Sequence, residues 1–357
     1  MKAAVLLLNF GEPEHATLHE VVPFLERIFS LNAQLEGRPP SPEARARSRA
    51  LAEARAPSLI AEYESIGGSP LHAQATQHAK LLEQALAARG HDVVILQGMQ
   101  FTEPSIPRAV AAARAAGAER VVALPVYPLC GPTTTIAALA EVEQEMRALG
   151  WNASLLEIAG WHRQPAYLRL RADAIRNATR EADVSLADPR TKLVFSAHGT
   201  PMHHIERGSR YDEYVRDFCA ILAADLGVGD YVIGYQNHAN RPGIAWTQPD
   251  IGSVIEEIDA DHVVVDPVSF MHEQSETLAE LDHELREQAE ARGLGFHRVM
   301  IPHDAPAFIE VLADLLEPLL AVGAGSRSRA AGSDAAVPRG LRPCRCRERP
   351  GTYCLNG

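Results

Sequence analysis

The 357-residue sequence lacks a long apolar run and an excess of basic residues. No stretch approaches the roughly 18 apolar residues of a membrane-spanning helix. The apolar segment Ala3–Asn9 is too short for the central region of a signal peptide with its cleavage site. The formal net charge of −12 disfavours non-specific binding to nucleic acid, which requires a basic surface. These absences predict a cytoplasmic protein without nucleic-acid partners, and they leave peripheral membrane contact open.

Cysteine is also scarce: only five are present, and Cys344, Cys346 and Cys354 lie within the last 14 residues. In a cytoplasmic protein such clustering favours a metal or iron–sulfur site over disulfide bonds. Thiolates are typical ligands of zinc and of iron–sulfur clusters, and Cys130 is available as a fourth ligand. Cys219 lies in a helical pattern and is expected to be a small buried apolar residue. A tail that binds no metal is the alternative.

Short apolar runs alternate with amphipathic segments along most of the chain. Runs such as 93–97 and 262–267 lack polar alternation, which is typical of strands buried on both faces. Strands that alternate with helices predict an α/β fold with parallel sheets covered by helices, and ligands then bind at the carboxyl ends of the strands. The predicted strands are Ala3–Asn9, Asp92–Gln97, Arg120–Leu124, Ala153–Ile158, Lys192–Ser196, Tyr231–Tyr235, His262–Asp266 and Phe296–Ile301.

Punctuation by glycine and proline divides the chain into two halves, which predicts a cleft between them. Gly160 and Pro165 lie at the junction, and the composition shifts to Gly, Ala, Ser and Arg from Gly323 onward. The predicted divisions are an N-terminal domain over 1–158, a C-terminal domain over 159–322, and a linker with a Cys-rich tail over 323–357. Residues 31–60 are helical and charged, and they predict either a lip over the cleft or a peripheral insertion.

A histidine follows one of the buried strands. Gly199 and Pro201 predict a turn after the strand over Lys192–Ser196, and this turn would point the imidazole of His198 into the cleft. An imidazole can accept a proton near pH 7 or bind a divalent metal. His198 is therefore a candidate catalytic base or metal ligand, and a histidine that caps the next turn is the alternative.

Three glutamates are spaced along a long helix predicted to begin near Gln274, after the strand that ends at Asp266. Glu276, Glu280 and Glu284 lie at i, i+4 and i+8, so they share one helix face. One interpretation is a solvated acidic stripe. The other is a ladder of hard oxygen ligands that passes hydrated divalent cations inward or protons outward. The position of this helix at the carboxyl end of a strand favours the ladder.

The segment Gly67-Gly68-Ser69-Pro70 predicts a turn before a helix. The N–H groups at the start of that helix could bind an anion, because the positive end of a helix dipole lies there. A plain loop is the alternative interpretation.

Four segments, in this order, resemble the ferrochelatase family: LLLNFGEP, YESIGGSPL, FSAHGTP and FMHEQSETLAELDHE. The resemblance runs from Val5 to Leu320. It implies two Rossmann-like domains, each a parallel four-stranded sheet flanked by helices, with a porphyrin bound in the cleft between them. It also implies a lyase of haem biosynthesis that inserts Fe²⁺ into the porphyrin with release of two protons.

The resemblance implies roles for individual residues. His198 corresponds to the family's catalytic histidine, which accepts the pyrrole protons or contacts the metal, and Glu276 corresponds to its partner carboxylate. Glu280 and Glu284 fall where the family carries an acidic path, so His198 and the three glutamates would line the route of Fe²⁺. The residues implied to bind the porphyrin are Gly67, Ser69, Pro70, Gln100, Phe101, Tyr127 and Gln274.

Some ferrochelatases carry a [2Fe–2S] cluster held by one internal and three C-terminal cysteines. Cys130, Cys344, Cys346 and Cys354 resemble that set. The role of such a cluster would be structural or sensory, because insertion of a metal into a porphyrin requires no electron transfer.

Two departures from the family pattern concern the porphyrin and proton contacts. Gln274 stands where many relatives carry a histidine, and Gln100 with Phe101 stands where relatives often have Arg-Tyr. The alternatives are a chelatase for another metal or tetrapyrrole, a non-catalytic porphyrin or haem carrier, and an iron sensor. The choice between protoporphyrin IX and coproporphyrin III stays open, as does that between a monomer and a homodimer.

Overall fold

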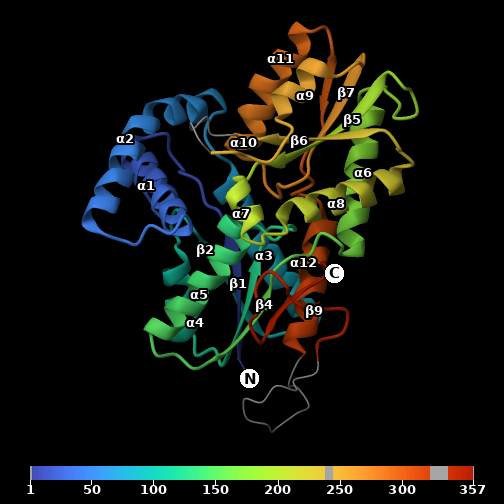
Figure 1. Cartoon of the computed structure of the whole chain (residues 1–357). Helices are drawn as coiled ribbons and strands as arrows, with labels where there is room; N and C mark the ends of the chain where they lie inside the picture. The colour runs from blue at the N-terminus through green and yellow to red at the C-terminus, as the bar shows by residue number, and fades with distance from the viewer. Residues whose placement is uncertain (1, 238–243, 322–336, 357) are drawn as a thin grey trace. The chain divides into compact units, whose positions relative to one another are not determined.

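The computed structural model describes residues 2–237, 244–321 and 337–356. The chain divides into two compact units, which are drawn together in Figure 1. Unit 1 comprises Met1–Trp161 and Ile309–Gly357, and unit 2 comprises His162–Phe308. Most of the linker predicted from residue 323 lies outside the described residues.

The sheet of unit 1 is built around β1 (Ala3–Asn9), every residue of which is buried. Its four parallel strands have the order β2 (Val93–Met99), β1, β3 (Arg120–Pro125) and β4 (Ser154–Ile158). β1 pairs with β2 on one side and with β3 on the other. An apolar strand with two parallel neighbours is the expected centre of a helix-covered sheet, so the α/β prediction is confirmed here.

The C-terminal tail adds two strands to this sheet. β10 (Thr352–Cys354) pairs in parallel with β4, and β9 (Arg342–Pro343) pairs antiparallel with β10. Figure 1 shows this red segment beside β4. The sheet of unit 1 therefore has six strands among the described residues, whereas four were predicted. Strands this short carry no local sequence signal, because they form only by pairing along the otherwise open edge of β4.

The helices described in unit 1 before β4 are α1 (Leu18–Leu35), α2 (Pro42–Ser65), α3 (Leu71–Ala88), α4 (Ile106–Ala115), the π-helical turn η1 (Pro132–Ile136) and α5 (Ala137–Ala148). α1 and α2 share an apolar cluster that contains Phe24 and Phe101. The rings of Phe10 and Phe101, which follow β1 and β2, lie 4.6 Å apart. The same apolar cluster includes residues of the helical segment predicted over 31–60. The cluster therefore packs this segment against the residues that follow β1 and β2.

The last long helix, α12 (Pro306–Leu320), belongs to unit 1 from Ile309 onward. Arg120, at the start of β3, donates from Nη1 to the carbonyl oxygen of Leu320 at 3.1 Å. Such contacts hold the helix against the sheet of unit 1. This division differs from the predicted one, in which residues 159–322 formed a single domain.

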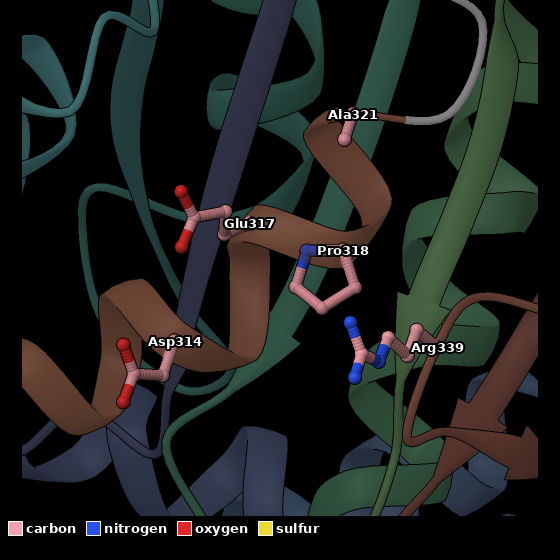
Figure 2. Close-up of a pocket in the computed structure, with 5 residues that line it drawn as sticks. All are labelled: Asp314, Glu317, Pro318, Ala321 and Arg339. Atoms are coloured by element: carbon pink, nitrogen blue, oxygen red, sulfur yellow. The ribbon is translucent and has the colours of Figure 1, made fainter.

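A surface hollow lies beside α12. The ion pairs of Arg89 with Asp314 (2.8 Å) and Glu317 (3.0 Å) join α12 to the end of α3 next to this hollow. None of the predicted catalytic or cysteine residues lines it, so it belongs to the packing of α12. The residues that line it, drawn in Figure 2, are Asp314, Glu317, Pro318, Ala321 and Arg339.

Unit 2 contains a parallel four-stranded sheet, as predicted. Its order is β6 (Tyr231–Gln236), β5 (Thr191–His198), β7 (His262–Pro267) and β8 (Gly295–Arg298). The carboxyl ends of β5, β6 and β7 therefore lie side by side. The longer helices described in this unit are α6 (Pro165–Glu181), α8 (Tyr211–Leu226), α9 (Ile251–Glu257) and α11 (Arg286–Ala291).

Among the helices of the described residues, none combines the length and the apolar character needed to cross a membrane.

Candidate active site and cysteine centre

His198 is the last residue of β5, and three contacts hold it in place. Its backbone N–H donates to Ser269 Oγ at 3.1 Å, and Tyr211 Oη donates to its carbonyl oxygen at 3.0 Å. In the ring, Nδ1 lies 2.6 Å from the carbonyl oxygen of Gly199. Because a carbonyl only accepts, Nδ1 carries the proton of this bond. The second ring nitrogen, Nε2, is therefore the atom that faces the reacting groups.

The structure brings His198 and Glu276 together, as the sequence predicts. Nε2 of His198 lies 3.4 Å from Oε1 of Glu276. Asn237, directly after β6, places Nδ2 at 3.2 Å from the same Nε2, and it donates to Oε1 of Glu276 at 2.5 Å. Its backbone is left-handed, with φ of 58°, a conformation that asparagine tolerates better than most residues. The sequence pattern did not single out Asn237.

The charge state of His198 follows from these neighbours. Burial lowers the pKa of His198, but the carboxylate of Glu276, with a smaller effect of Glu280, raises it to about 9. The side chain of His198 is 39% exposed and that of Glu276 is 15% exposed, so the pair lies at the edge of the interior. The imidazole is therefore protonated at neutral pH, whereas the sequence suggested a neutral ring.

Glu280 lies behind this pair, next to the buried side chain of Gln236 at the end of β6. Gln236 Nε2 donates to Oε2 of Glu280 at 3.0 Å and to the carbonyl oxygen of Glu276 at 2.7 Å. Ser196 Oγ donates to Oε1 of Gln236 at 2.6 Å, which orients the amide. Burial, and then the charge of Glu276, raises the pKa of Glu280 to about 8, so this carboxyl holds a proton at neutral pH.

The predicted long helix is interrupted where it carries the glutamates. α10 (Ser275–Leu278) is a single turn, the π-helix η2 (Glu280–Leu285) follows, and α11 comes after it. Glu284 N donates to the carbonyl oxygen of Ala279, five residues earlier, at 3.1 Å. In an α-helix, side chains four residues apart differ in direction by roughly 40°, because four residues overshoot a full turn. The wider π-turn reduces this difference between successive glutamates. Such turns are frequent at functional sites.

The acidic ladder runs from solvent to the histidine. Glu284 is exposed, while Glu280 is half-buried and lies close enough to both other carboxylates for their charges to raise its pKa. Glu276 contacts His198 at the inner end. Glu280 thus lies within electrostatic reach of both other carboxyl groups, and the ladder stays a prediction.

Gln274 and Glu273 have different environments although they are adjacent. Gln274 Nε2 donates to Oε2 of Glu276 at 3.2 Å, and its backbone N–H donates to Thr277 Oγ1 in a capping box. Glu273 is buried and accepts from Arg298 Nη1 at 3.0 and 3.1 Å. Gln274 therefore supports the carboxylate of Glu276, and Glu273 anchors the loop to β8.

In unit 1, Gly67, Ser69 and Pro70 form the turn that the sequence predicts. The φ angle of Gly67 is 75°, which favours glycine, and Ser69 Oγ accepts from Leu71 N at 3.2 Å at the start of α3. Ser69 Oγ also donates to Glu12, a buried carboxylate that accepts from Tyr63 Oη at 3.1 Å. Glu12 therefore fixes the turn, a role the sequence did not indicate.

The other three residues predicted to bind porphyrin in unit 1 follow strands β2 and β3. Phe101 is 4% exposed and packs in the apolar cluster of α1 and α2. Gln100 Nε2 donates to the carbonyl oxygen of Thr133 at 3.1 Å, and Tyr127 is half-buried just after β3. The ring of Phe101 is thus used in packing, while Gln100 and Tyr127 lie at the carboxyl ends of strands.

The cysteines predicted to share a centre do meet. The Sγ atoms of Cys130, Cys344 and Cys346 all lie within 4.8 Å of one another. Cys354 joins them through Cys344: a hydrogen bond from Cys344 and, with smaller effects, backbone N–H groups hold the pKa of the Cys354 thiol below its ordinary value. Cys219 is buried in α8, as expected. Thiols gathered in this way can hold a metal ion. Hydrogen bonds within the group hold the pKa of Cys344 and Cys354 below the ordinary value, which favours the thiolate form that metals bind, whereas hydrogen bonds to Cys344 and Cys346 raise the pKa of Cys130.

Ionic contacts dock the cysteine tail on the edge of β4 without using sulfur. Glu157, which is fully buried, accepts from Arg347 Nε at 2.8 Å and from Arg347 Nη2 at 3.1 Å. Thr352 Oγ1 also donates to Glu157, and Arg347 Nη2 reaches Glu143 at 2.8 Å. A bidentate arginine–carboxylate pair of this kind is strong and directional, so it fixes the register of the tail.

The parallel sheets flanked by helices are shared with a solved structure. The structure of SirB from Bacillus subtilis with Fe³⁺ is similar, with a TM-score of 0.50 and 12% sequence identity over 88% of this chain and 95% of SirB. At this identity the likeness shows the fold alone. It places the chain in the chelatase fold class.

Sequence comparison gives the family. Residues 2–319 match the Ferrochelatase family model. The ferrochelatase of Citrifermentans bemidjiense is 30% identical over 322 residues, which cover 88% of this chain and 98% of that relative. The ferrochelatase of Aquifex aeolicus is 30% identical over 324 residues, which cover 89% and 99%. This chain belongs to the ferrochelatase family, as its four sequence segments predict.

Proposed function

We propose that this chain is a lyase of haem biosynthesis that inserts Fe²⁺ into a porphyrin with release of two protons. One observation carries the proposal. Nε2 of His198 and Oε1 of Glu276 lie 3.4 Å apart, and Glu280 lies close enough to both for their charges to affect its pKa. The proposed location is the cytoplasm, where thiol ligands stay reduced.

The proton chemistry follows from the pair. A porphyrin must lose two N–H protons as the metal enters, and a ring nitrogen of neutral His198 can accept a proton from it. The carboxylate of Glu276 stabilises the imidazolium that forms. Glu280, whose pKa is about 8, can exchange protons with its neighbours near neutral pH and relay them toward Glu284.

The metal chemistry needs ligands that bind weakly enough to release Fe²⁺. Carboxylate oxygens are hard ligands with exchangeable geometry, unlike thiolates. We assign the carboxylates from exposed Glu284 through Glu280 to Glu276 as the route. The proposed porphyrin contacts are Gly67, Ser69, Pro70, Gln100, Tyr127 and Gln274, whereas the buried ring of Phe101 supports α1 and α2. Bending of the bound macrocycle would expose its protons and lone pairs at the expense of binding energy.

The direct test is metallation under anaerobic conditions. The purified chain, Fe²⁺ and either protoporphyrin IX or coproporphyrin III should yield the Soret band of the corresponding haem. Comparison of kcat/KM for the two porphyrins identifies the substrate. Tight porphyrin binding without metallation would refute the proposal and favour a carrier.

We expect the pH dependence of kcat/KM to reflect the titration of His198 beside Glu276. The neutral, proton-accepting form of His198 grows as pH rises toward 9, so kcat/KM should rise over this range, by up to roughly tenfold per pH unit. In Glu276→Gln the main group that raises the pKa of His198 is absent. The pKa of its ring, measured by NMR titration, should therefore fall toward the ordinary value of about 6.5.

Glu287→Gln is the matched control for this titration, because Glu287 is an exposed glutamate on α11. It should leave the titration of His198 unchanged. An unchanged pKa in Glu276→Gln would show that the carboxylate does not govern the imidazole.

We also propose that Cys130, Cys344, Cys346 and Cys354 hold a [2Fe–2S] cluster. The proposal is supported by the four-thiol donor set and by the resemblance to cluster-bearing relatives. The cluster would supply a stable iron–sulfur centre beside β4 in unit 1, whereas the proposed metallation residues belong to unit 2. A single zinc ion is the second candidate, and the absorption and metal content of freshly purified protein distinguish the two.

A further inference from the structure

The side chain of Asn356 is buried next to the cysteine centre without satisfying its polar atoms. The residue is 3% exposed, and neither its Nδ2 nor its Oδ1 has a hydrogen-bond partner among the residues that the structure describes. Burial of an amide in this way is unfavourable unless a partner is supplied. Such a group therefore requires an explanation of its own.

Gly160 provides the space that the amide occupies. A Cβ atom on Gly160 would lie 2.0 Å from Nδ2 of Asn356 and 3.5 Å from Cβ of Cys130. The amide nitrogen and the first cysteine of the centre are therefore neighbours on the same side of this glycine. Leu355 N donates to the carbonyl oxygen of Gly160 at 2.9 Å, which holds the end of the chain in this position.

The backbone of the same residue also faces the centre. Sγ of Cys354 lies 3.0 Å from the carbonyl oxygen of Asn356. A backbone N–H of Asn356 is one of the groups that hold the pKa of the Cys354 thiol down, after the larger effect of Cys344. Asn356 thus contacts the surroundings of Cys130 with its side chain and Cys354 with its backbone.

We infer that Asn356 Nδ2 donates a hydrogen bond to a sulfur of the cluster held by the four cysteines, and so tunes its reduction potential. The inference rests on the proposed cluster. Thiolate and sulfide sulfurs accept hydrogen bonds, and the amide has two N–H groups to donate. A donor stabilises the more negative, reduced cluster, so the hydrogen bond raises the potential.

Two cationic side chains of the tail, those of Arg347 and Arg349, are engaged by carboxylates. Arg347 pairs with Glu157 and Glu143, and Arg349 Nε donates to Glu143 at 3.1 Å. By contrast, the neutral amide of Asn356 is a buried donor of the tail that does not bond to these carboxylates. Its function requires no change in net charge at the centre.

The test uses the full chain, purified under anaerobic conditions. Asn356→Leu keeps a side chain of similar size and removes the N–H groups. We expect a lower reduction potential in a dye-mediated titration followed by EPR, with cluster content and porphyrin metallation unchanged. Gly160→Ala, which fills the space of Nδ2, should shift the potential in the same direction. Asn356→Gln retains an amide, so its reduction potential should lie between that of Asn356→Leu and that of the wild type.

A measurement on the unmutated protein covers the case in which a variant fails to assemble. The reduced wild-type chain, labelled with ¹⁵N in the asparagine side-chain amide, should show a nitrogen coupling to the cluster in pulsed EPR. Absence of this coupling, or an unchanged potential in Asn356→Leu, overturns the inference and leaves the cluster proposal intact. A wild-type chain without iron–sulfur absorption overturns both, whereas iron insertion is measured separately by the Soret assay.

Discussion

Replacement of His198 by alanine is expected to lower kcat/KM for porphyrin metallation by roughly 10²- to 10⁴-fold, the usual contribution of a general base. The substitution removes the ring nitrogen that faces Glu276, while the partners of the backbone, Ser269 and Tyr211, remain. The fold should therefore persist. The initial rate of haem formation, followed at the Soret band with Fe²⁺ in excess, measures the effect.

His283→Ala is the matched control for this experiment. His283 lies on η2 among the ladder residues, but its side chain is exposed. Its removal should change kcat/KM by less than a factor of about two, as expected for a surface substitution. If His198→Ala retained full activity with an unchanged melting temperature, the imidazole would not take part in metallation and the proposed mechanism would be wrong.

Cys344→Ser is expected to abolish the cluster. The thiol of Cys344 interacts with those of Cys130, Cys346 and Cys354, and the interaction with Cys130 contributes most to lowering its pKa. A serine hydroxyl is a much poorer ligand for iron than a thiolate. The purified variant should lack the visible absorption of the cluster and its iron and sulfide content.

The same variant should remain folded at moderate temperature, because the ion pairs of Arg347 with Glu157 hold the tail without sulfur. Cys219→Ser is the control, since Cys219 is a buried cysteine of α8 in unit 2. It should keep the full cluster content. Full cluster content in Cys344→Ser would show that the four-thiol assignment is wrong.

The predicted parts of the fold are those with strong local signals. The eight longer strands appear at the predicted places because their apolar runs can be buried only inside helix-covered sheets. The β9 and β10 pair was missed because each strand is two or three residues long and is formed by its neighbour. The π-turn of η2 was missed because a wider helical turn changes the hydrogen bonding without changing the apolar period.

The candidate site divides in the same way. His198, Glu276 and the tail cysteines lie in recognisable sequence segments. Asn237 and Gln236 have no such signal, since they reach Glu276 only through the lateral order of β6 and β5. Asn356 also has no sequence signal, because only the folded chain places its amide beside Gly160.

The amino-acid order alone determined the family, the histidine and glutamate that meet at the strand ends, and the four thiols that could share an ion. These follow from the chemistry of single side chains and from short-range spacing. Only the tertiary structure decided that Glu276 lies where it raises the pKa of the imidazole, that the tail forms strands on β4, and that α12 joins unit 1. A pKa, a strand pairing and a helix–sheet contact each depend on residues far apart in the chain, and no local pattern encodes the distances between them.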